Sequence, residues 1–123
     1  MKIKHNYLSE QFQNSKKIFR LIDDTVKFND FTLGRYVDLF EREFCKYQKV
    51  KYSIGVGSGT DAIFLSLKAL GIKEGDEVIT PTYSFYATAG AIATAGAKPV
   101  FVDIKDDLNI DEDKIEKKIT KKT

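Results

Sequence analysis

Apolar and polar residues are spaced in one way in the first part of this 123-residue chain and in another way in the rest. In the first part, apolar side chains recur every three or four positions, which is typical of helices with one apolar face. The residues that carry this spacing are Ile18, Leu21, Ile22, Val37, Phe40, Phe44 and Tyr47. We therefore predict two amphipathic helices, one from about Ser15 to Val26 and one across the second group of residues.

From Tyr52 onward, short apolar runs alternate with longer helical patterns. The predicted strands are Tyr52–Val56, Glu77–Thr80 and Pro99–Asp103. The predicted helices are Thr60–Leu70, which is apolar on nearly every side, Ser84–Ala95, and a short helix capped by Asp111 that contains Ile115 and Ile119. This strand, helix, strand, helix, strand order predicts an α/β domain with a mostly parallel sheet and flanking helices on both faces.

Composition narrows the classes of function. Twenty basic and eighteen acidic residues leave a formal charge of +2, and the lysines are scattered except near the end of the chain, so no nucleic-acid surface is indicated. The single cysteine, Cys45, is expected to be a packing residue and has no internal disulfide partner. With one histidine, His5, a His-based metal site or a His-dependent triad cannot be assembled from this chain alone. The chain shows neither a leader nor a run of about eighteen apolar residues, so we expect a cytoplasmic protein without a membrane partner.

A glycine-rich turn between a predicted strand and a predicted helix is the first candidate binding site. It consists of Gly55-Val56-Gly57-Ser58-Gly59-Thr60-Asp61. At a helix start, free backbone amides and the positive end of the helix dipole favour an anion, and glycines let a phosphate approach closely. Such turns also occur where the chain only needs positive φ angles. A simple phosphate cradle fits better than a nucleotide site, because Thr60 stands where a dinucleotide fingerprint has its third glycine and the chain has no Gly-Lys-Ser or Gly-Lys-Thr.

An aromatic segment follows the next predicted strand. It consists of Pro81-Thr82-Tyr83-Ser84-Phe85-Tyr86-Ala87-Thr88. Open α/β sheets bind ligands beyond the carboxyl ends of their strands, so this segment and the glycine turn can face one crevice. An aromatic side chain at that place can lie flat on a planar cofactor. From composition alone, however, filling a core is the better explanation of these aromatic residues.

Several motifs stand in order along the chain. They are Phe31-Thr32-Leu33-Gly34, Phe40-Glu41, Gly57-Ser58-Gly59-Thr60-Asp61-Ala62, Gly75-Asp76-Glu77-Val78-Ile79-Thr80-Pro81, Ser84-Phe85-Tyr86-Ala87-Thr88, Gly96-Ala97-Lys98-Pro99-Val100-Phe101-Val102-Asp103, and Ile119-Thr120 with Thr123. Together they resemble the DegT/DnrJ/EryC1/StrS family of sugar aminotransferases, in the fold-type I class of pyridoxal-phosphate enzymes. The resemblance implies an N-terminal helical segment over residues 1–30 and, over residues 31–123, part of the large cofactor-binding α/β domain with an incomplete sheet.

The resemblance also implies site residues. The backbone amides of Gly59, Thr60 and Asp61, with the Thr60 hydroxyl, would hold the phosphate of pyridoxal 5′-phosphate, and Phe85 would stack on its pyridine ring. The Asp61 carboxylate is expected to be a helix N-terminal charge and not a catalyst. No metal ligand is implied.

The implied activity is transfer of an amino group from an amino acid, with glutamate as the expected donor, to a nucleotide-linked keto sugar in polysaccharide or amino-sugar biosynthesis. Family members are much longer, and the lysine that carries the cofactor, the aspartate that binds its pyridinium and a partner-subunit contact to the phosphate all follow the point where this chain stops. We therefore expect a truncated chain that has no catalytic residue and is inactive in isolation. Its full-length form is expected to be a homodimer.

Two other hypotheses stay open. The first is a pyridoxal-phosphate-dependent sugar dehydratase of the same family, in which a histidine replaces the lysine and the amino group is eliminated. The second is a non-catalytic module that dimerises or binds phosphate compounds without chemistry. Sequence beyond Thr123 would distinguish the first from an aminotransferase, and cofactor titration of the isolated chain would test the second.

Overall fold

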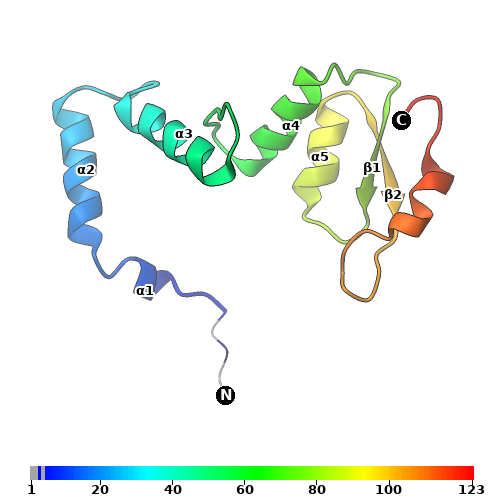
Figure 1. The fold of residues 1–123 in the computed structure, drawn as a ribbon, viewed down its shortest axis with the longest axis horizontal. Helices are drawn as coiled ribbons and strands as arrows, with labels where there is room; N and C mark the ends of the chain where they lie inside the picture. Colours follow the sequence, from blue (N-terminus) through cyan, green and yellow to red (C-terminus); the bar gives the residue numbers. More distant parts are fainter. Residues whose placement is uncertain (1–2, 4) are drawn as a thin grey trace. The chain divides into compact units, whose positions relative to one another are not determined.

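A computed structural model describes residue 3 and residues 5–123 of the chain. It forms two compact units, the first reaching to Gly55 and the second running from Val56 to Thr123 (Figure 1). We call these the N-terminal unit and the C-terminal unit. The domain boundary expected between residues 30 and 31 stays a prediction. No helix among the described residues combines the length and the apolar character that crossing a membrane requires.

The N-terminal unit is helical. It contains α1 (Leu8–Gln11), α2 (Ser15–Lys27) and α3 (Arg35–Gln48), and the last two confirm the helices predicted from apolar spacing. Helix α3 ends at Lys49, whose φ of 55° places it in the left-handed region that stops a helix. After that residue the chain turns back, and the Gly55 amide donates a hydrogen bond of 2.6 Å to the Glu41 carboxylate. Cys45 is half-buried on α3, as expected for a packing residue.

The strand predicted at Tyr52–Val56 is wrong for this chain. These residues have no regular secondary structure, and the side chains of Tyr52 and Ile54 are exposed. A strand needs a neighbour to accept and donate its backbone hydrogen bonds. Among the described residues only β1 and β2 form a sheet, and neither strand pairs with this segment. The apolar pattern is therefore present without the partner that would turn it into a strand.

The C-terminal unit contains a two-stranded parallel sheet with helices against it. Strand β1 (Glu77–Pro81) pairs with β2 (Lys98–Val102), with Glu77 opposite Lys98 and Pro81 opposite Val102. Helix α5 (Tyr86–Thr94) connects the strands and packs on both of them, and α4 (Gly59–Ala69) packs along α5. The predicted α/β class with an incomplete parallel sheet and flanking helices is thus confirmed, with boundaries shifted by one or two residues.

Small side chains make the core of this unit. The fully buried apolar residues are Ala87, Ala91, Ile92, Ala95, Ala97 and Val102. Alanine along one side of α5 lets the helix approach the strands closely, and Gly96 then turns the chain with a φ of +95°. Helix α4 is apolar on nearly every side, yet none of its residues is buried. The sheet and α5 therefore hold the unit together.

The last part of the chain folds back onto the sheet. Asp111 accepts a hydrogen bond from the Asp113 amide, as predicted for a cap. The predicted short α-helix is wrong, because the chain after Asp111 forms a pair of 3-10 turns, η1 (Glu112–Lys114) and η2 (Glu116–Lys118). In Figure 1 the two strands lie between α5 and these turns. Beyond them, the Glu77 amide donates to the Lys122 carbonyl at 2.7 Å, so the end of the chain lies beside the start of β1.

Candidate functional site

One end of the C-terminal unit collects the features on which the expected site depends. Both strands point toward that end, and α4 and α5 both begin there (Figure 1). This follows from the alternation of parallel strands and antiparallel helices, which puts the carboxyl ends of strands and the amino ends of helices on one side. The glycine turn and the aromatic segment consequently lie at the same end of the unit.

The start of α4 presents free backbone donors. Ser58 is the N-cap, and its hydroxyl accepts the Asp61 amide at 3.1 Å and donates to the Asp61 carboxylate at 2.9 Å. The Ala62 amide donates to the Ser58 carbonyl. Within the part of the chain that the structure describes, the amides of Gly59 and Thr60 have no acceptor. Two of the three expected phosphate donors are therefore available, whereas the Asp61 amide already holds the cap.

The glycines of this turn differ in the space around them. A Cβ added at Gly59 would meet no atom within 4 Å, so the surface in front of this residue is open. A Cβ at Gly57 would stand 3.0 Å from the Asp61 carboxylate. Open space beside two unpaired amides at the positive end of an 11-residue helix suits a phosphoryl group. The residues present therefore fit the phosphate of the implied cofactor.

Phe85 is the N-cap residue of α5 and lies at the same end. Its side chain is 69% exposed, and its ring centroid is 4.5 Å from that of Tyr86, with an interplanar angle of 53°. The Phe85 carbonyl accepts a hydrogen bond from the Thr88 amide, and the hydroxyls of Ser84 and Thr88 bond each other at 2.9 Å. These two hydrogen bonds fix the backbone on either side of Phe85. The exposed aromatic face is free to cover a flat ligand.

A cavity of about 170 Å³ opens beside Phe85. Its lining consists of Thr80, Pro81, Thr82, Ser84, Phe85, Tyr86, Thr88, Ala89 and Phe101. These side chains are aromatic, hydroxyl-bearing or small, and none carries a charge. Gly59, Thr60 and Asp61 do not line it, so the structure brings the expected phosphate donors to the same end of the unit as Phe85 but not into one enclosed pocket with it.

Sequence reasoning did not single out Thr80. It is 4% exposed, the most polar of the buried residues, and its hydroxyl has no hydrogen-bond partner among the described residues. The sequence shows only a threonine that follows Val78 and Ile79 in a predicted strand, which is too common a feature to mark a site. The pattern alone could not show that this residue would line the cavity next to Phe85.

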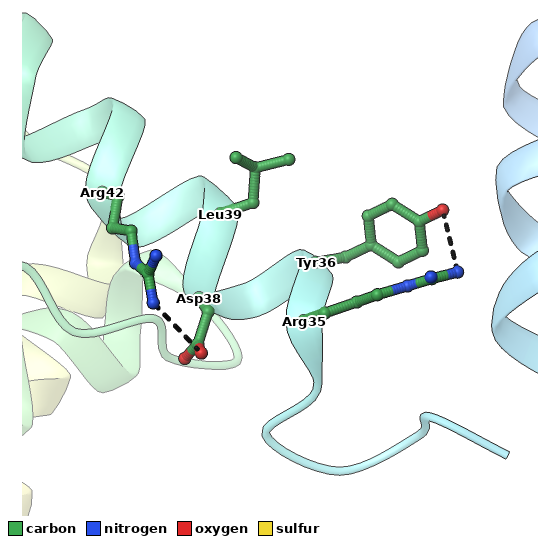
Figure 2. A pocket seen from close by; sticks show the side chains of 5 residues that line it. All are labelled: Arg35, Tyr36, Asp38, Leu39 and Arg42. Atoms are coloured by element: carbon green, nitrogen blue, oxygen red, sulfur yellow. Dashed lines mark hydrogen bonds and ion pairs between the residues drawn. The ribbon is translucent and has the colours of Figure 1, made fainter. Parts of the chain in front are cut away.

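A larger, more open cavity lies on α3 in the N-terminal unit. Its volume is about 360 Å³, and it is lined by Arg35, Tyr36, Asp38, Leu39 and Arg42. Figure 2 shows the Arg42 guanidinium paired with Asp38, at 3.8 Å, and the Arg35 guanidinium reaching the Tyr36 hydroxyl at 3.4 Å. Both arginines are mostly exposed and already have partners. This cavity is the surface of a single helix, without a buried polar group to define a ligand.

The loop after β2 forms a third cavity, and both lysines that line it are paired with carboxylates. Lys105 bonds Glu112 at 2.6 Å, and Lys114 bonds Asp111 at 2.8 Å. These lysines hold the pKa values of Glu112 and Asp111 below their ordinary range, chiefly through those hydrogen bonds. No group of three His, Cys, Asp or Glu side chains within the described residues is arranged to hold a metal ion. The loop is thus a set of ion pairs that shapes the turn between β2 and η1.

Curated relatives share much of this chain. It is 48% identical over 118 residues to a "Pleiotropic regulatory protein" from Geobacillus stearothermophilus, an alignment that covers 94% of this chain and 32% of that protein. It is 44% identical over 91 residues to "GDP-perosamine synthase" from Vibrio cholerae, which covers 73% of this chain and 25% of the enzyme. The chain therefore spans about a third of the length of these relatives, or less.

Solved structures are similar in fold. DesV from S. venezuelae superposes with a TM-score of 0.86 at 34% identity, over 94% of this chain and 31% of that chain. NtdA from Bacillus subtilis, solved with the cofactor PMP bound, superposes with a TM-score of 0.82 at 40% identity, over 89% of this chain and 25% of that chain. Both similarities extend through most of the elements described above.

A family profile matches residues 13–123, which is nearly the whole chain. The order of the motifs, the α/β arrangement of the C-terminal unit and the similarity to solved aminotransferases agree with that match. The chain belongs to the DegT/DnrJ/EryC1/StrS aminotransferase family.

Proposed function

We propose that this chain supplies the phosphate cradle and the ring-covering aromatic residue of a pyridoxal 5′-phosphate site. The observation that carries the proposal is the pair of unpaired amides at the start of α4, with open space before them, at the same end of the unit as Phe85. Structural relatives solved with PMP support the choice of cofactor. The activity of the whole protein would be amino transfer from an amino acid, with glutamate the expected donor, to a nucleotide-linked keto sugar.

Each site residue has a distinct part in this proposal. The amides of Gly59 and Thr60 donate to the phosphoryl oxygens, and the Thr60 hydroxyl adds a third donor. The Asp61 amide joins them if it releases the Ser58 hydroxyl, which it bonds in this structure. Phe85 covers one face of the pyridine ring. When bound, the cofactor supplies the electron sink that the reaction needs, and the protein orients it.

No residue of this chain is proposed as the base that moves a proton. None of the described residues that line the cavity beside Phe85 is a lysine. Lys98 bonds Glu77 at 3.3 Å, at the first residue pair of the sheet, which is the opposite end of the strands from Phe85. We therefore propose that the isolated chain binds the cofactor without transferring an amino group.

The partners and location of the whole protein belong to the same proposal. The names of relatives such as "GDP-perosamine synthase" and "dTDP-3-amino-3,6-dideoxy-alpha-D-galactopyranose transaminase" support a nucleotide sugar as the substrate class. A homodimer is supported by the many large apolar side chains left exposed on α2 and α3. A cytoplasmic location is proposed for an enzyme of this substrate class.

Pyridoxamine 5′-phosphate is the sharpest probe of the binding proposal. It carries the ring and the phosphate but no aldehyde, so it cannot react with the 17 lysines of the chain. Isothermal titration of the 123-residue chain should show saturable binding, and pyridoxamine and inorganic phosphate should each bind much more weakly. Equal binding of pyridoxamine with and without its phosphate would exclude a phosphate cradle at α4.

The variant Gly59→Ala tests phosphate binding separately from the stability of the fold. The added methyl group meets no atom within 4 Å, so the chain should keep its stability. The same methyl group occupies the approach to the free amides, and a lost charge-assisted hydrogen bond corresponds to a loss of about tenfold or more in affinity. Leu70→Ala, at the other end of α4, is the control and should bind like wild type. Unchanged affinity in Gly59→Ala would refute the cradle.

The inactivity of the isolated chain has its own test. The chain is incubated with pyridoxal 5′-phosphate, glutamate and a nucleotide-linked keto sugar, and amino sugar is measured by mass spectrometry. We expect no turnover. Turnover together with borohydride trapping of the cofactor on one specific lysine would show that the chain carries a complete site.

A further inference from the structure

The core of the C-terminal unit does not enclose the ring of Phe85. The side chain is 69% exposed, although hydrogen bonds of Ser84 and Thr88 fix the backbone on either side of it. A side chain on a fixed backbone still has staggered χ1 orientations open to it, and an exposed one exchanges among them unless a neighbour restricts it. The neighbours of Phe85 therefore decide how often its ring faces the cavity that it lines.

Tyr86 is the neighbour whose ring contacts that of Phe85. The two ring centroids are 4.5 Å apart and the ring planes are tilted by 53°, which is within the range of favourable aromatic pairs. Consecutive side chains of an extended segment point to opposite faces. Here Phe85 is the extended N-cap of α5 and Tyr86 is the first residue of the helix. The rings meet at the place where the backbone changes from extended to helical.

Tyr86 contributes little to the core of the unit. Its side chain is 78% exposed, and its hydroxyl forms no hydrogen bond with the part of the chain that the structure describes. Like Phe85, it lines the 170 Å³ cavity. Among the described residues, the one ring that Tyr86 contacts is that of Phe85, the residue proposed to cover the cofactor.

We propose that Tyr86 is a positioning residue, which holds the ring of Phe85 in the orientation that faces the cavity before a flat ligand binds. This inference rests on the proposed function, because it takes Phe85 to cover the pyridine ring of the cofactor. The apparent affinity of a site is proportional to the fraction of molecules in the binding-competent conformation. If Phe85 were released among three equally populated orientations, that fraction would fall to about a third.

Substitution of Tyr86 should change the orientation of Phe85 and the affinity together. In Tyr86→Ala, the affinity for pyridoxamine 5′-phosphate should fall about threefold in isothermal titration. Thermal unfolding should be nearly unchanged, because the side chain is exposed. Three-bond NMR couplings to Cγ of Phe85 in the free chain should change from the value of a single χ1 rotamer to an average. Tyr86→Phe keeps the ring and should match wild type in all three measurements.

Tyr83→Ala is the matched control. Tyr83 belongs to the same aromatic segment and is 66% exposed, but it does not line the cavity, and its ring contacts no other ring among the described residues. This variant should change neither the couplings of Phe85 nor the affinity. A loss of affinity as large as in Tyr86→Ala would mean that the ligand needs aromatic surface in general, and it would refute the specific role of Tyr86.

A double-mutant cycle separates positioning from direct contact with the ligand. If Tyr86 acts through Phe85, Tyr86→Ala should have no further effect on affinity in a Phe85→Ala background. An effect that persists there would show that Tyr86 contacts the ligand itself. Averaged couplings of Phe85 in the free wild-type chain would show that no orientation is held. Either result refutes the inference and leaves the cofactor site standing.

Other outcomes bear on the proposed function as well. If Phe85→Ala binds pyridoxamine 5′-phosphate as tightly as wild type does, Phe85 does not cover the ring, and the role of Tyr86 is refuted with it while the phosphate cradle stands. If wild type shows no binding of pyridoxamine 5′-phosphate, both proposals are refuted.

Discussion

The two units of this chain bury their apolar residues very differently. All the buried residues that the structure describes belong to the C-terminal unit, and none of the described residues up to Gly55 is buried. On α2, Phe19 is 66% exposed and Val26 56% exposed, although both belong to the apolar part of a strongly amphipathic helix. The amphipathic helices of the N-terminal unit leave their apolar faces exposed, whereas α5, which is mostly apolar all round, builds a core with the strands of the C-terminal unit.

The difference shows that an amphipathic pattern specifies a helix without supplying what covers it. Helices of 13 and 14 residues are marginal in water when they depend on local interactions alone. Their local support includes exposed ion pairs such as Lys27 with Asp23 and Lys46 with Glu43, which solvent screens and which therefore add little. The C-terminal unit instead has a sheet and α5 in contact, so burial contributes to its stability.

The largest expected effect on the free energy of unfolding comes from truncating a core side chain to alanine. Ile92 is 2% exposed and lies on the buried side of α5, so Ile92→Ala should lower the free energy of unfolding by about 2–5 kcal/mol. Ile22→Ala in α2, where the side chain is 52% exposed, should cost less than about 1 kcal/mol. Residue-resolved hydrogen exchange measures both. Equal losses at the two positions would mean that the units do not differ in burial as described.

Backbone conformation gives a second contrast of opposite sign. Gly96 has a φ of +95°, and a Cβ there would lie 3.2 Å from the Glu74 amide nitrogen, so Gly96→Ala should destabilise the C-terminal unit by about 1–2 kcal/mol. Lys49 ends α3 with a φ of 55°, which glycine adopts more readily, so Lys49→Gly should stabilise α3 by about 0.5–1 kcal/mol. Thermal unfolding followed by circular dichroism should show shifts in opposite directions. A loss of stability in both variants would contradict the assignment of backbone strain to Lys49.

Helix capping distinguishes the units on a smaller scale. Ser58→Ala removes the hydroxyl that accepts the Asp61 amide and should cost about 1 kcal/mol. Asn14, the N-cap of α2, forms no side-chain cap hydrogen bond, so Asn14→Ala should cost only a few tenths of that amount. Amide exchange in the first turn of each helix is the measurement. A comparable loss at Asn14 would show that α2 is capped in solution.

The smallest expected effect is a dependence on pH. The Thr120 hydroxyl, and after it the Lys98 ammonium, hold the pKa of the Glu77 carboxyl below its ordinary value. A carboxyl with a lowered folded-state pKa adds stability above its unfolded pKa and loses it as the pH falls through the folded one. Glu77→Gln should therefore be less stable than wild type at pH 7, and the difference should shrink below a pH of about 4.3.

A control for that experiment lies in the N-terminal unit. Glu43 pairs with Lys46 on the exposed surface of α3, where ion pairs add little. Glu43→Gln should change stability only slightly at either pH, as measured by denaturant titration. A difference for Glu77→Gln that persists unchanged at low pH would assign the effect to lost packing and not to the charge.

Local patterns in the sequence determined most of the secondary structure. The periodicity around Ile18 and Phe40 predicted α2 and α3, and the apolar runs after Tyr52 predicted β1 and β2 within one or two residues. These features depend on neighbouring residues along the chain, which is why periodicity detects them. The order of strands and helices also predicted that the start of α4 and Phe85 would lie at the same end of the sheet.

Tertiary structure decided which predicted strands find a partner and which polar groups are buried. Tyr52–Val56 has the composition of a strand but no strand to pair with among the described residues, and pairing is a long-range property. The burial of Thr80, and the lack of a hydrogen-bond partner for its hydroxyl among the described residues, result from tertiary packing. The periodicity of the sequence could place each of these residues in an element, but hydrogen-bond partners and burial are set by residues far apart in the chain.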